Sequence, residues 1–229
     1  MGSSSIDKLL EMDLSATEDD WHPTPHGQLL AKTLATQDLV SDRSVLELGG
    51  GVGNHTILLV RKGAARVVTT EITESRSETT RRNVALNCER ADDVEYRVAD
   101  WLQTPGTFDV VVTNPPFAVS GKQNRRYFID SLILDAHKRL VAGGSLIFIQ
   151  SSMADLGKTM RRLDENGFDA DVIATSRGPF RGYYFEDETF MAEIQDVPAG
   201  FEMVDGTHYE TLSVIRATLR AFAPPQGAH

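Results

Sequence analysis

Short apolar blocks alternate with amphipathic stretches along the first two thirds of the chain. The blocks are rich in β-branched residues and bounded by Gly, Asp or Asn, which is typical of buried strands. These strands are expected at 44–48, 66–71, 94–98, 108–113 and 145–149. The helical spacing of apolar residues predicts helices at 5–12, 25–39, 53–61, 74–87, 125–141 and 155–166. Such alternation predicts a doubly wound α/β fold whose mostly parallel sheet binds ligands at the carboxyl ends of its strands.

The last third of the chain departs from this alternation. Two further strands are expected at 169–176 and 211–219, which brings the predicted sheet to seven strands. The residues between them, 177–208, are rich in aromatic and acidic side chains. A connection of this length inside a compact domain is usually functional, so we expect a substrate lid or arm there.

The composition is that of one globular domain. We assign residues 22–222 to it, with an N-terminal helical extension at 1–21 and a disordered tail at 223–229. The net charge of −10 disfavours a large nucleic-acid partner, because gripping phosphates needs a basic face. The single cysteine, Cys88, excludes an internal disulfide, and no apolar run is long enough for a membrane span. The first residues lack the order of a signal peptide, so a cytoplasmic location is expected.

A glycine-rich turn follows the first predicted strand. The sequence "VLELGGGVGNHT" places Gly49, Gly51 and Gly53 at alternate positions after Glu47 and before a helix. Glycines let the backbone turn sharply and let a ligand approach it closely. No Lys-Ser/Thr pair follows, which disfavours a nucleoside-triphosphate loop.

Acidic residues end the next two strands. Glu71 stands 18 residues beyond Gly53, where a carboxylate accepts hydrogen bonds from the hydroxyls of a ribose. Asp100 precedes Trp101 at the end of the third strand, where an acid beside an aromatic ring suits an adenine amine. A nicotinamide-dependent oxidoreductase shares the glycine turn and Glu71, but it has no need of Asp100.

The fourth predicted strand runs into the sequence "TNPPF". Asn-Pro often opens a turn, so a rigid stop after the strand is one interpretation. The other is a jaw for a planar nitrogen-bearing molecule, in which the Asn114 side-chain oxygen and the Pro115 carbonyl accept hydrogen bonds from its two N–H bonds. These acceptors favour a pyramidal nitrogen and aim its lone pair at an electrophile. The prolines fix the backbone direction, and Phe117 stacks on the planar group.

In this order the motifs resemble those of the class I S-adenosylmethionine-dependent methyltransferases, and more narrowly the subgroup with an N-P-P-F/Y signature. The resemblance covers residues 22–150. It implies a Rossmann-like fold, S-adenosylmethionine as cofactor and S-adenosylhomocysteine as product. The cofactor-binding residues that it implies are Glu47, Gly49, Gly51 and Gly53 at the methionine part, Glu71 at the ribose, Asp100 and Trp101 at the adenine, and Thr24 closing over the cofactor. The catalytic residues that it implies are Asn114, Pro115 and Phe117.

The subgroup methylates nitrogen in several kinds of acceptor. It includes release-factor glutamine methyltransferases, methylases of exocyclic amines in nucleic acids, and small-molecule N-methyltransferases. Only residues 1–21 precede the shared core here and no basic recognition domain is visible, which favours a small molecule or a peptide. Aromatic and acidic residues of 177–208 suit a cationic or amine-bearing planar molecule through stacking and charge pairing. The candidate substrate-binding residues are Phe117, Phe180, Tyr183, Tyr184 and Glu186.

Several alternatives stay open. One is methylation of an rRNA or tRNA base, with Lys122, Arg125 and Arg126 contacting phosphates, and another is methylation of a protein glutamine. A nicotinamide-dependent oxidoreductase and a non-catalytic cofactor-binding scaffold are more remote. The histidines are not spaced as a metal set, so no metal is expected. A monomer and a homodimer both fit the sequence.

Overall fold

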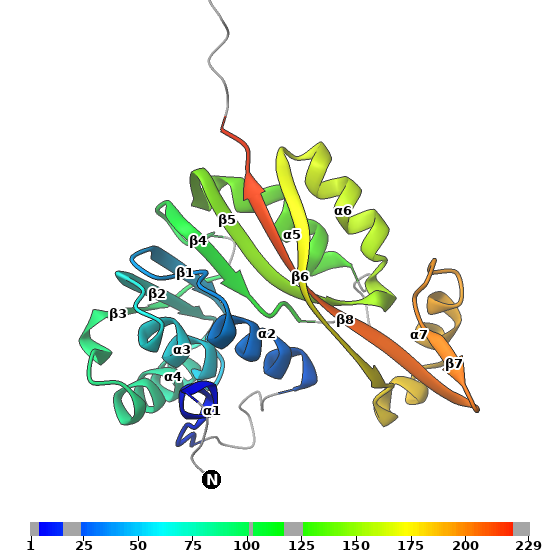
Figure 1. Cartoon of the computed structure of the whole chain (residues 1–229), viewed down its shortest axis with the longest axis horizontal. Helices are drawn as coiled ribbons and strands as arrows, with labels where there is room; N and C mark the ends of the chain where they lie inside the picture. Colours follow the sequence, from blue (N-terminus) through cyan, green and yellow to red (C-terminus); the bar gives the residue numbers. More distant parts are fainter. Residues whose placement is uncertain (1–4, 16–23, 101–102, 117–125, 222–229) are drawn as a thin grey trace, which may run out of the picture.

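The computed structural model describes residues 5–15, 24–100, 103–116 and 126–221. Its centre is one mixed sheet with the strand order β3-β2-β1-β4-β5-β8-β6, and β7 pairs with β8 outside this path (Figure 1). The strands are β1 (Ser44–Leu48), β2 (Arg66–Glu71), β3 (Val94–Val98), β4 (Phe108–Thr113), β5 (Leu140–Ser151), β6 (Phe168–Pro179), β7 (Glu202–Val204) and β8 (Thr207–Leu219).

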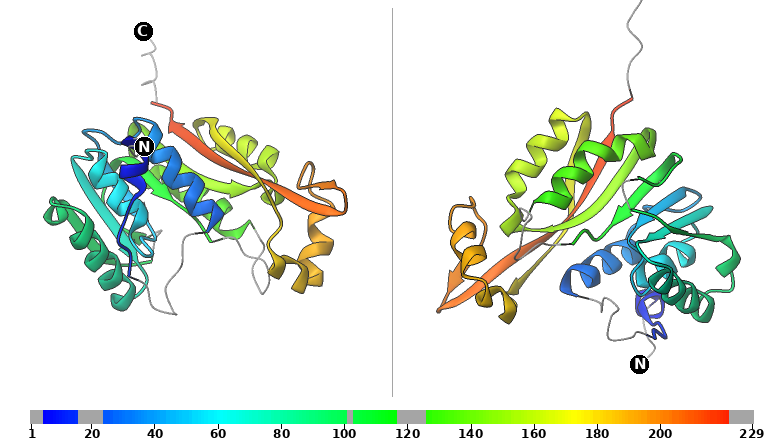
Figure 2. Two further views of the ribbon diagram at one scale, coloured as in Figure 1. Left: turned by 60° about the horizontal axis from the view of Figure 1, so that its bottom comes forward. Right: turned by 180° about the vertical axis from the view of Figure 1, so that it is seen from behind.

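Helices cover both faces of the sheet. They are α1 (Ser5–Leu10), α2 (Pro25–Thr36), α3 (Asn54–Arg61), α4 (Glu74–Asn87), α5 (Tyr127–Asp135), α6 (Leu156–Glu165) and α7 (Glu188–Ile194). One apolar cluster joins α2, α3 and α4 to one face, and a second joins α5 and α6 to the other (Figure 2). Among the described residues, no helix is both long and apolar enough to cross a bilayer.

The sheet confirms the predicted α/β class. Strands β3, β2, β1, β4 and β5 are parallel, while β8 runs antiparallel to both β5 and β6. Since β6 and β5 both oppose β8, they run in the same direction. The carboxyl ends of β1, β2, β4 and β6 therefore lie along one edge of the sheet, the edge at which a ligand is expected.

The largest error among the predicted boundaries is at residues 125–141. The helix expected at 125–141 ends at Asp135, a 3-10 turn follows at Ala136–Arg139, and β5 already begins at Leu140. The register between β4 and β5 shifts here, from Phe108 opposite Leu140 to Val110 opposite Ser145. The apolar residues of this stretch fit both the helical and the strand period, so the sequence pattern does not separate the two elements. The extra residues between them are accommodated by an irregular start of β5.

Residues 177–208, which we call the arm, are ordered by a small core of their own. Strands β6 and β8 extend beyond the main sheet and carry a 3-10 turn (Gly182–Glu186), α7 and β7 at their far end (Figure 1). The arm lies at the opposite end of the molecule from β3 and α4 (Figure 2). Its core is a cluster of Met153, Phe180, Tyr184, Phe190 and Ile194. Burial of these side chains, rather than a ligand, accounts for much of the arm's aromatic content.

Candidate functional site

A cavity of about 460 Å³ opens at the carboxyl edge of the sheet. Its wall is built from the start of α2, the glycine turn after β1, Glu71 at the end of β2, the residues that follow β4, and two residues of the arm. This is where open α/β sheets bind their ligands. The volume suits a small organic molecule.

The glycine turn has the conformation that only glycine adopts readily. Gly49, Gly51 and Gly53 have φ angles of +79°, +56° and +88°. Gly49 and Gly51 line the cavity, and the positions where their Cβ atoms would stand are empty space. The sequence did not single out Gly50, yet a Cβ there would lie 2.5 Å from the Thr69 hydroxyl oxygen. The turn therefore offers bare backbone to a ligand and packs closely against β2.

Glu71 lies at the cavity wall, as predicted from its place at the end of β2. Its side chain is nearly buried, with 8% of the residue exposed. One carboxylate oxygen accepts a hydrogen bond from the Gly51 amide at 2.6 Å, and the other accepts one from the Ile72 amide at 3.2 Å. The acid thus ties the glycine turn to β2 and lines the cavity.

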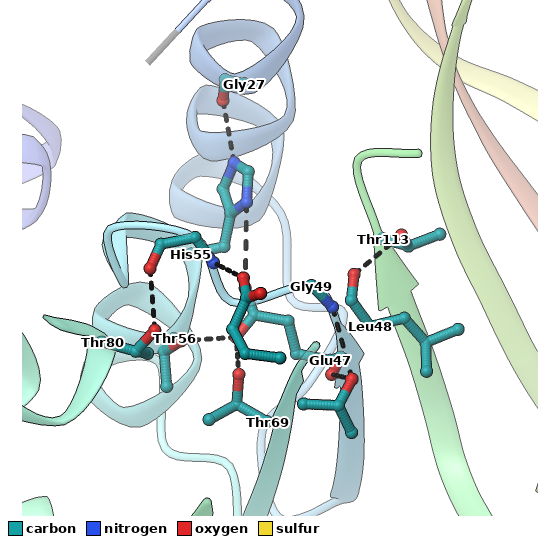
Figure 3. A network of polar contacts seen from close by, with 12 residues as sticks. Gly27, Glu47, Leu48, Gly49, His55, Thr56, Thr69, Thr80 and Thr113 are labelled. Carbon is teal, nitrogen blue, oxygen red and sulfur yellow. Dashed lines mark hydrogen bonds and ion pairs between the residues drawn. The ribbon is translucent and has the colours of Figure 1, made fainter. Parts of the chain in front are cut away.

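Glu47 takes part in a buried polar network beneath the turn (Figure 3). It is 1% exposed and is not part of the cavity wall. Its Oε2 atom accepts hydrogen bonds from the hydroxyls of Thr56 and Thr69. Its Oε1 atom lies 3.9 Å from Nδ1 of His55, whose Nε2 is 3.0 Å from the Gly27 carbonyl oxygen. The network connects the turn to the first residues of α2.

The Gly27 contact fixes the protonation of this network. A carbonyl only accepts hydrogen bonds, so Nε2 of His55 carries the proton and Nδ1 presents a lone pair to Glu47. Burial lowers the pKa of His55, and burial raises the pKa of Glu47 to about 8. A neutral carboxylic acid facing a neutral imidazole satisfies both shifts and places no charge in the core.

This neutral pair predicts that stability depends on pH. The folded pKa of Glu47 lies above its unfolded value, so the folded chain holds a proton that the unfolded chain releases, and raising the pH removes stability. Below about pH 6.5 a protonated His55 in the unfolded chain offsets that proton. As the pH rises from about 6.5 to 8, we expect the free energy of unfolding to fall by up to about 1.4 kcal/mol per pH unit because of this pair.

Glu47→Gln should remove this slope, because an amide keeps an acceptor for both threonines and a donor for His55 but does not titrate. Urea unfolding of both proteins at about pH 6.5 and pH 8 measures it. Glu95→Gln is the control, since hydrogen bonds from Arg97 and Arg66 lower the pKa of Glu95 and it titrates only at acid pH. Parallel profiles for the wild type and Glu47→Gln would contradict the neutral pair.

The residues after β4 form the other side of the cavity. Asn114 is half-buried, and its side chain has no hydrogen-bond partner among the described residues. Pro115 is buried, and the preceding Thr113 donates a hydrogen bond to the Leu48 carbonyl at 2.9 Å, which fixes the end of β4 against β1. A Cβ on Gly27 would lie 3.6 Å from the Asn114 amide nitrogen, so α2 packs directly against this side chain.

Thr24, which is predicted to close over the cofactor, is also the cap of a helix. It lies at the cavity wall, and as the N-cap of α2 its hydroxyl accepts a hydrogen bond from the Gly27 amide at 3.3 Å. The cap fixes the first turn of α2, and that turn carries Gly27 to both Asn114 and His55.

Other predicted site residues are not at the cavity wall. Asp100 follows β3 and is exposed, and Trp101 and Phe117 lie outside the described residues. Phe180 and Tyr184 are buried in the core of the arm, and Glu186 is exposed to solvent away from the cavity. Of the arm residues expected to contact a substrate, the structure brings Tyr183 alone to the wall described here.

The sequence missed several residues that line the cavity. His55 lies in the first turn of α3, and Arg76 lies in α4, the helix that follows Glu71 and β2. Phe128, in α5, is a second aromatic residue at the cavity wall, in addition to Tyr183 of the arm. Burial, and then the charge of Arg181, lower the pKa of His26 to about 4, so it is neutral at physiological pH. Of these residues, His55 was the one that the sequence pattern could have indicated, because it stands two residues after the glycine turn. Its role depends on its contact with Gly27.

Arg126 does not take the phosphate-binding role considered in the RNA alternative. Its side chain is 3% exposed. It donates hydrogen bonds to the Thr159 hydroxyl at 3.0 Å and to Asp130 at 2.9 Å, and also contacts the carbonyls of Ala154 and Asp155. These contacts join α5 to α6, so the guanidinium is structural. Lys122 and Arg125 lie outside the described residues.

Within the described ranges, no group of three or more His, Cys, Asp or Glu residues is arranged to hold a metal ion. The cavity wall instead carries one carboxylate, two guanidinium groups and the side-chain amides of Asn54 and Asn114. Those groups, with the bare backbone of the glycine turn, suit an uncharged-to-zwitterionic organic ligand held by hydrogen bonds.

Comparison with known proteins agrees with this arrangement. A protein of Methanocaldococcus jannaschii with the provisional name protein N5-glutamine methyltransferase is 27% identical over 176 residues, which are 70% of this chain and 86% of that protein. The tRNA1(Val) (adenine(37)-N6)-methyltransferase of Phocaeicola vulgatus is 31% identical over 110 residues, 47% of this chain and 42% of that enzyme. The chain thus spans less than half of the tRNA enzyme.

Solved structures share the fold. The structure described as that of an RNA methyltransferase candidate from Pyrococcus horikoshii superposes with a TM-score of 0.64 at 16% identity, covering 96% of this chain and all of that one. The family model of the methyltransferase small domain matches residues 25–173, from the first turn of α2 into β6. Since this match includes the glycine turn, Glu71 and Asn114, the chain belongs to the methyltransferase small domain family.

Proposed function

We propose that this chain transfers a methyl group from S-adenosylmethionine to a planar amine or amide nitrogen of a small molecule or peptide. The observation that carries the proposal is the Asn114 amide, which stands at the cavity wall without a hydrogen-bond partner among the described residues. A polar side chain left open in a half-buried position suits a ligand that supplies the missing bonds.

The described residues fit S-adenosylmethionine. The bare backbone at Gly49 and Gly51 leaves room for the methionine part, and the Glu71 carboxylate stands where it can accept hydrogen bonds from ribose hydroxyls. Asp100 and Trp101 remain predictions for the adenine. When bound, this cofactor supplies an electrophilic methyl group on a positively charged sulfur.

The task of the chain is then to position the acceptor. The Asn114 side-chain oxygen and the Pro115 carbonyl would accept hydrogen bonds from the two N–H groups of the methyl acceptor. These bonds would aim the lone pair of its nitrogen along the line of transfer. Phe128, Tyr183 and Phe117 are candidates to stack on a planar group. Closing the site against water completes the requirements, because no general base is needed before the transfer.

The side-chain amide of a glutamine in a peptide or protein is the second candidate. The M. jannaschii relative, named for that activity, aligns over 86% of its own length. A nucleic-acid base is a third acceptor type, named for the P. vulgatus relative. The net charge of −10 and the structural role of Arg126 argue against RNA here.

Two measurements test the proposal. Isothermal titration should show binding of S-adenosylmethionine and S-adenosylhomocysteine, and no binding of a nicotinamide dinucleotide. Incubation with methyl-labelled cofactor and fractionated cell extract should place the label on nitrogen in the small-molecule or peptide fraction. Binding of the nicotinamide dinucleotide alone would refute the methyl-transfer reading, and label in RNA alone would refute the acceptor class.

A further inference from the structure

The charged side chain that the arm presents to the cavity is basic. Arg181 and Tyr183 of the arm lie at the wall, whereas the acidic Glu186 is exposed to solvent elsewhere. The acids and aromatic residues of the arm predicted a cationic or amine-bearing planar acceptor. The cationic part of that prediction is disfavoured, because the charged group of the arm at the cavity wall is a guanidinium.

Arg181 is on the acceptor side of the cavity. It follows the carboxyl end of β6, while Glu71 ends β2, and β1, β4, β5 and β8 lie between these two strands in the sheet. Its Nη2 atom is 3.5 Å from Nδ1 of His26. The next residue, Gly27, packs against Asn114. A chain of direct contacts therefore joins Arg181 to the jaw residue, whereas the ribose acid is on the other flank.

The guanidinium is held in place by the hydroxyl of a buried tyrosine. The Tyr184 hydroxyl accepts hydrogen bonds from Nε, at 2.9 Å, and Nη2 of Arg181. The same hydroxyl donates to Glu210 at 3.2 Å, and both anchoring residues are buried. Among the described residues, Arg181 forms no ion pair, and its Nη1 atom makes no hydrogen bond. A positive charge with an open edge is thus aimed at a half-enclosed space.

Resting on the proposed function, we propose that Arg181 binds a carboxylate of the methyl acceptor. The acceptor is then a planar amine or amide that also carries a carboxylate, with Tyr183 packed beside it. A guanidinium matches the planar geometry of a carboxylate and forms short charge-assisted hydrogen bonds with it. Arg181 is accordingly a specificity residue, and Asn114 acts on the nitrogen.

Matched ligand pairs in which one member carries a carboxylate and the other a neutral amide or ester in its place test this assignment. The probes are 4-aminobenzoate with 4-aminobenzamide, and N-acetyl-L-glutamine with its methyl ester, each titrated into protein saturated with S-adenosylhomocysteine. For the wild type we expect the carboxylated member of at least one pair to bind about 10-fold or more tightly. Arg181→Gln should abolish this preference.

Arg177→Gln is the matched control. Arg177 is also on β6, but it is ion-paired with Glu202, lies over the Tyr209 ring and is outside the cavity wall. That variant should keep the full preference. The side-chain Nε–H signal of Arg181, assigned as the one absent from Arg181→Lys, should shift in wild-type protein with the carboxylated probe only, which gives a readout even if Arg181→Gln does not fold.

Three results would overturn the assignment. They are no carboxylated probe binding in the millimolar range, equal binding within both pairs, and a loss of S-adenosylmethionine affinity in Arg181→Gln with the carboxylate preference retained. In the last case Arg181 would serve the cofactor. None of these results would contradict the proposed methyl transfer. That proposal fails separately, if the wild type does not bind S-adenosylmethionine.

Discussion

Asn114→Ala is expected to lower turnover about 100-fold or more while leaving the dissociation constant of S-adenosylmethionine nearly unchanged. The amide is half-buried beside Gly27 and has no hydrogen-bond partner among the described residues, so its removal breaks no hydrogen bond within that part of the fold. What is lost is the acceptor oxygen that orients the nitrogen. Single-turnover kinetics with the acceptor found by methyl labelling, together with calorimetric titration of the cofactor, would measure the two effects.

Two further variants frame this result. Asn114→Asp keeps an acceptor oxygen and should retain more turnover than the alanine variant. Asn166→Ala removes an asparagine that caps α6 away from the cavity and should leave turnover unchanged. If Asn114→Ala retained wild-type turnover, the jaw interpretation would be wrong, and a cofactor-binding scaffold or another acceptor-binding group would replace it.

Glu71→Ala is expected to weaken S-adenosylmethionine binding about 10- to 100-fold. The carboxylate provides charge-assisted acceptors for a ribose, and it also holds the Gly51 amide at 2.6 Å, so the variant loses both a ligand contact and the support of the turn. Isothermal titration with S-adenosylhomocysteine as the ligand measures the loss without turnover.

The control for Glu71 is Glu78→Ala. Glu78 is an exposed acid on α4, paired with Arg81, and it is not at the cavity wall, so its removal should leave affinity unchanged. Glu71→Gln, which keeps an acceptor for Gly51 but not the charge, should fall between the wild type and Glu71→Ala. Unaltered affinity in Glu71→Ala would show that the ribose lies elsewhere.

The sequence predicts well those parts of this molecule that depend on local chemistry. Strand periodicity predicts the strands themselves. The glycines at 49, 51 and 53 and the acid at the end of β2 are recognised by their local chemistry, and they lie together at one edge of the sheet. The proline pair after β4 is there too. These features can be predicted because the carboxyl ends of parallel strands meet wherever the strands themselves form.

The arm shows where prediction from sequence ends. Phe180, Tyr184 and Tyr183 are close in sequence and similar in chemistry, yet the first two are buried and Tyr183 is 43% exposed at the cavity. Which aromatic residue faces inward is decided by packing against Phe190 of the arm and against Met153, which is distant along the chain. The Glu47–His55 pair is similar, because its protonation depends on a carbonyl of α2.

The separate core of the arm has a consequence for how this enzyme family can diversify. Neither of the two clusters that flank the main sheet includes a described residue between 180 and 206. Strands β6 and β8 pair from the main sheet into the arm, with one register shift between Val172 and Ala174, so they form a stem onto which a different cap could be grafted. Under the proposed function, recombination at the two strand ends would exchange the arm together with any acceptor preference that it carries, and would leave the glycine turn and Glu71 unaltered.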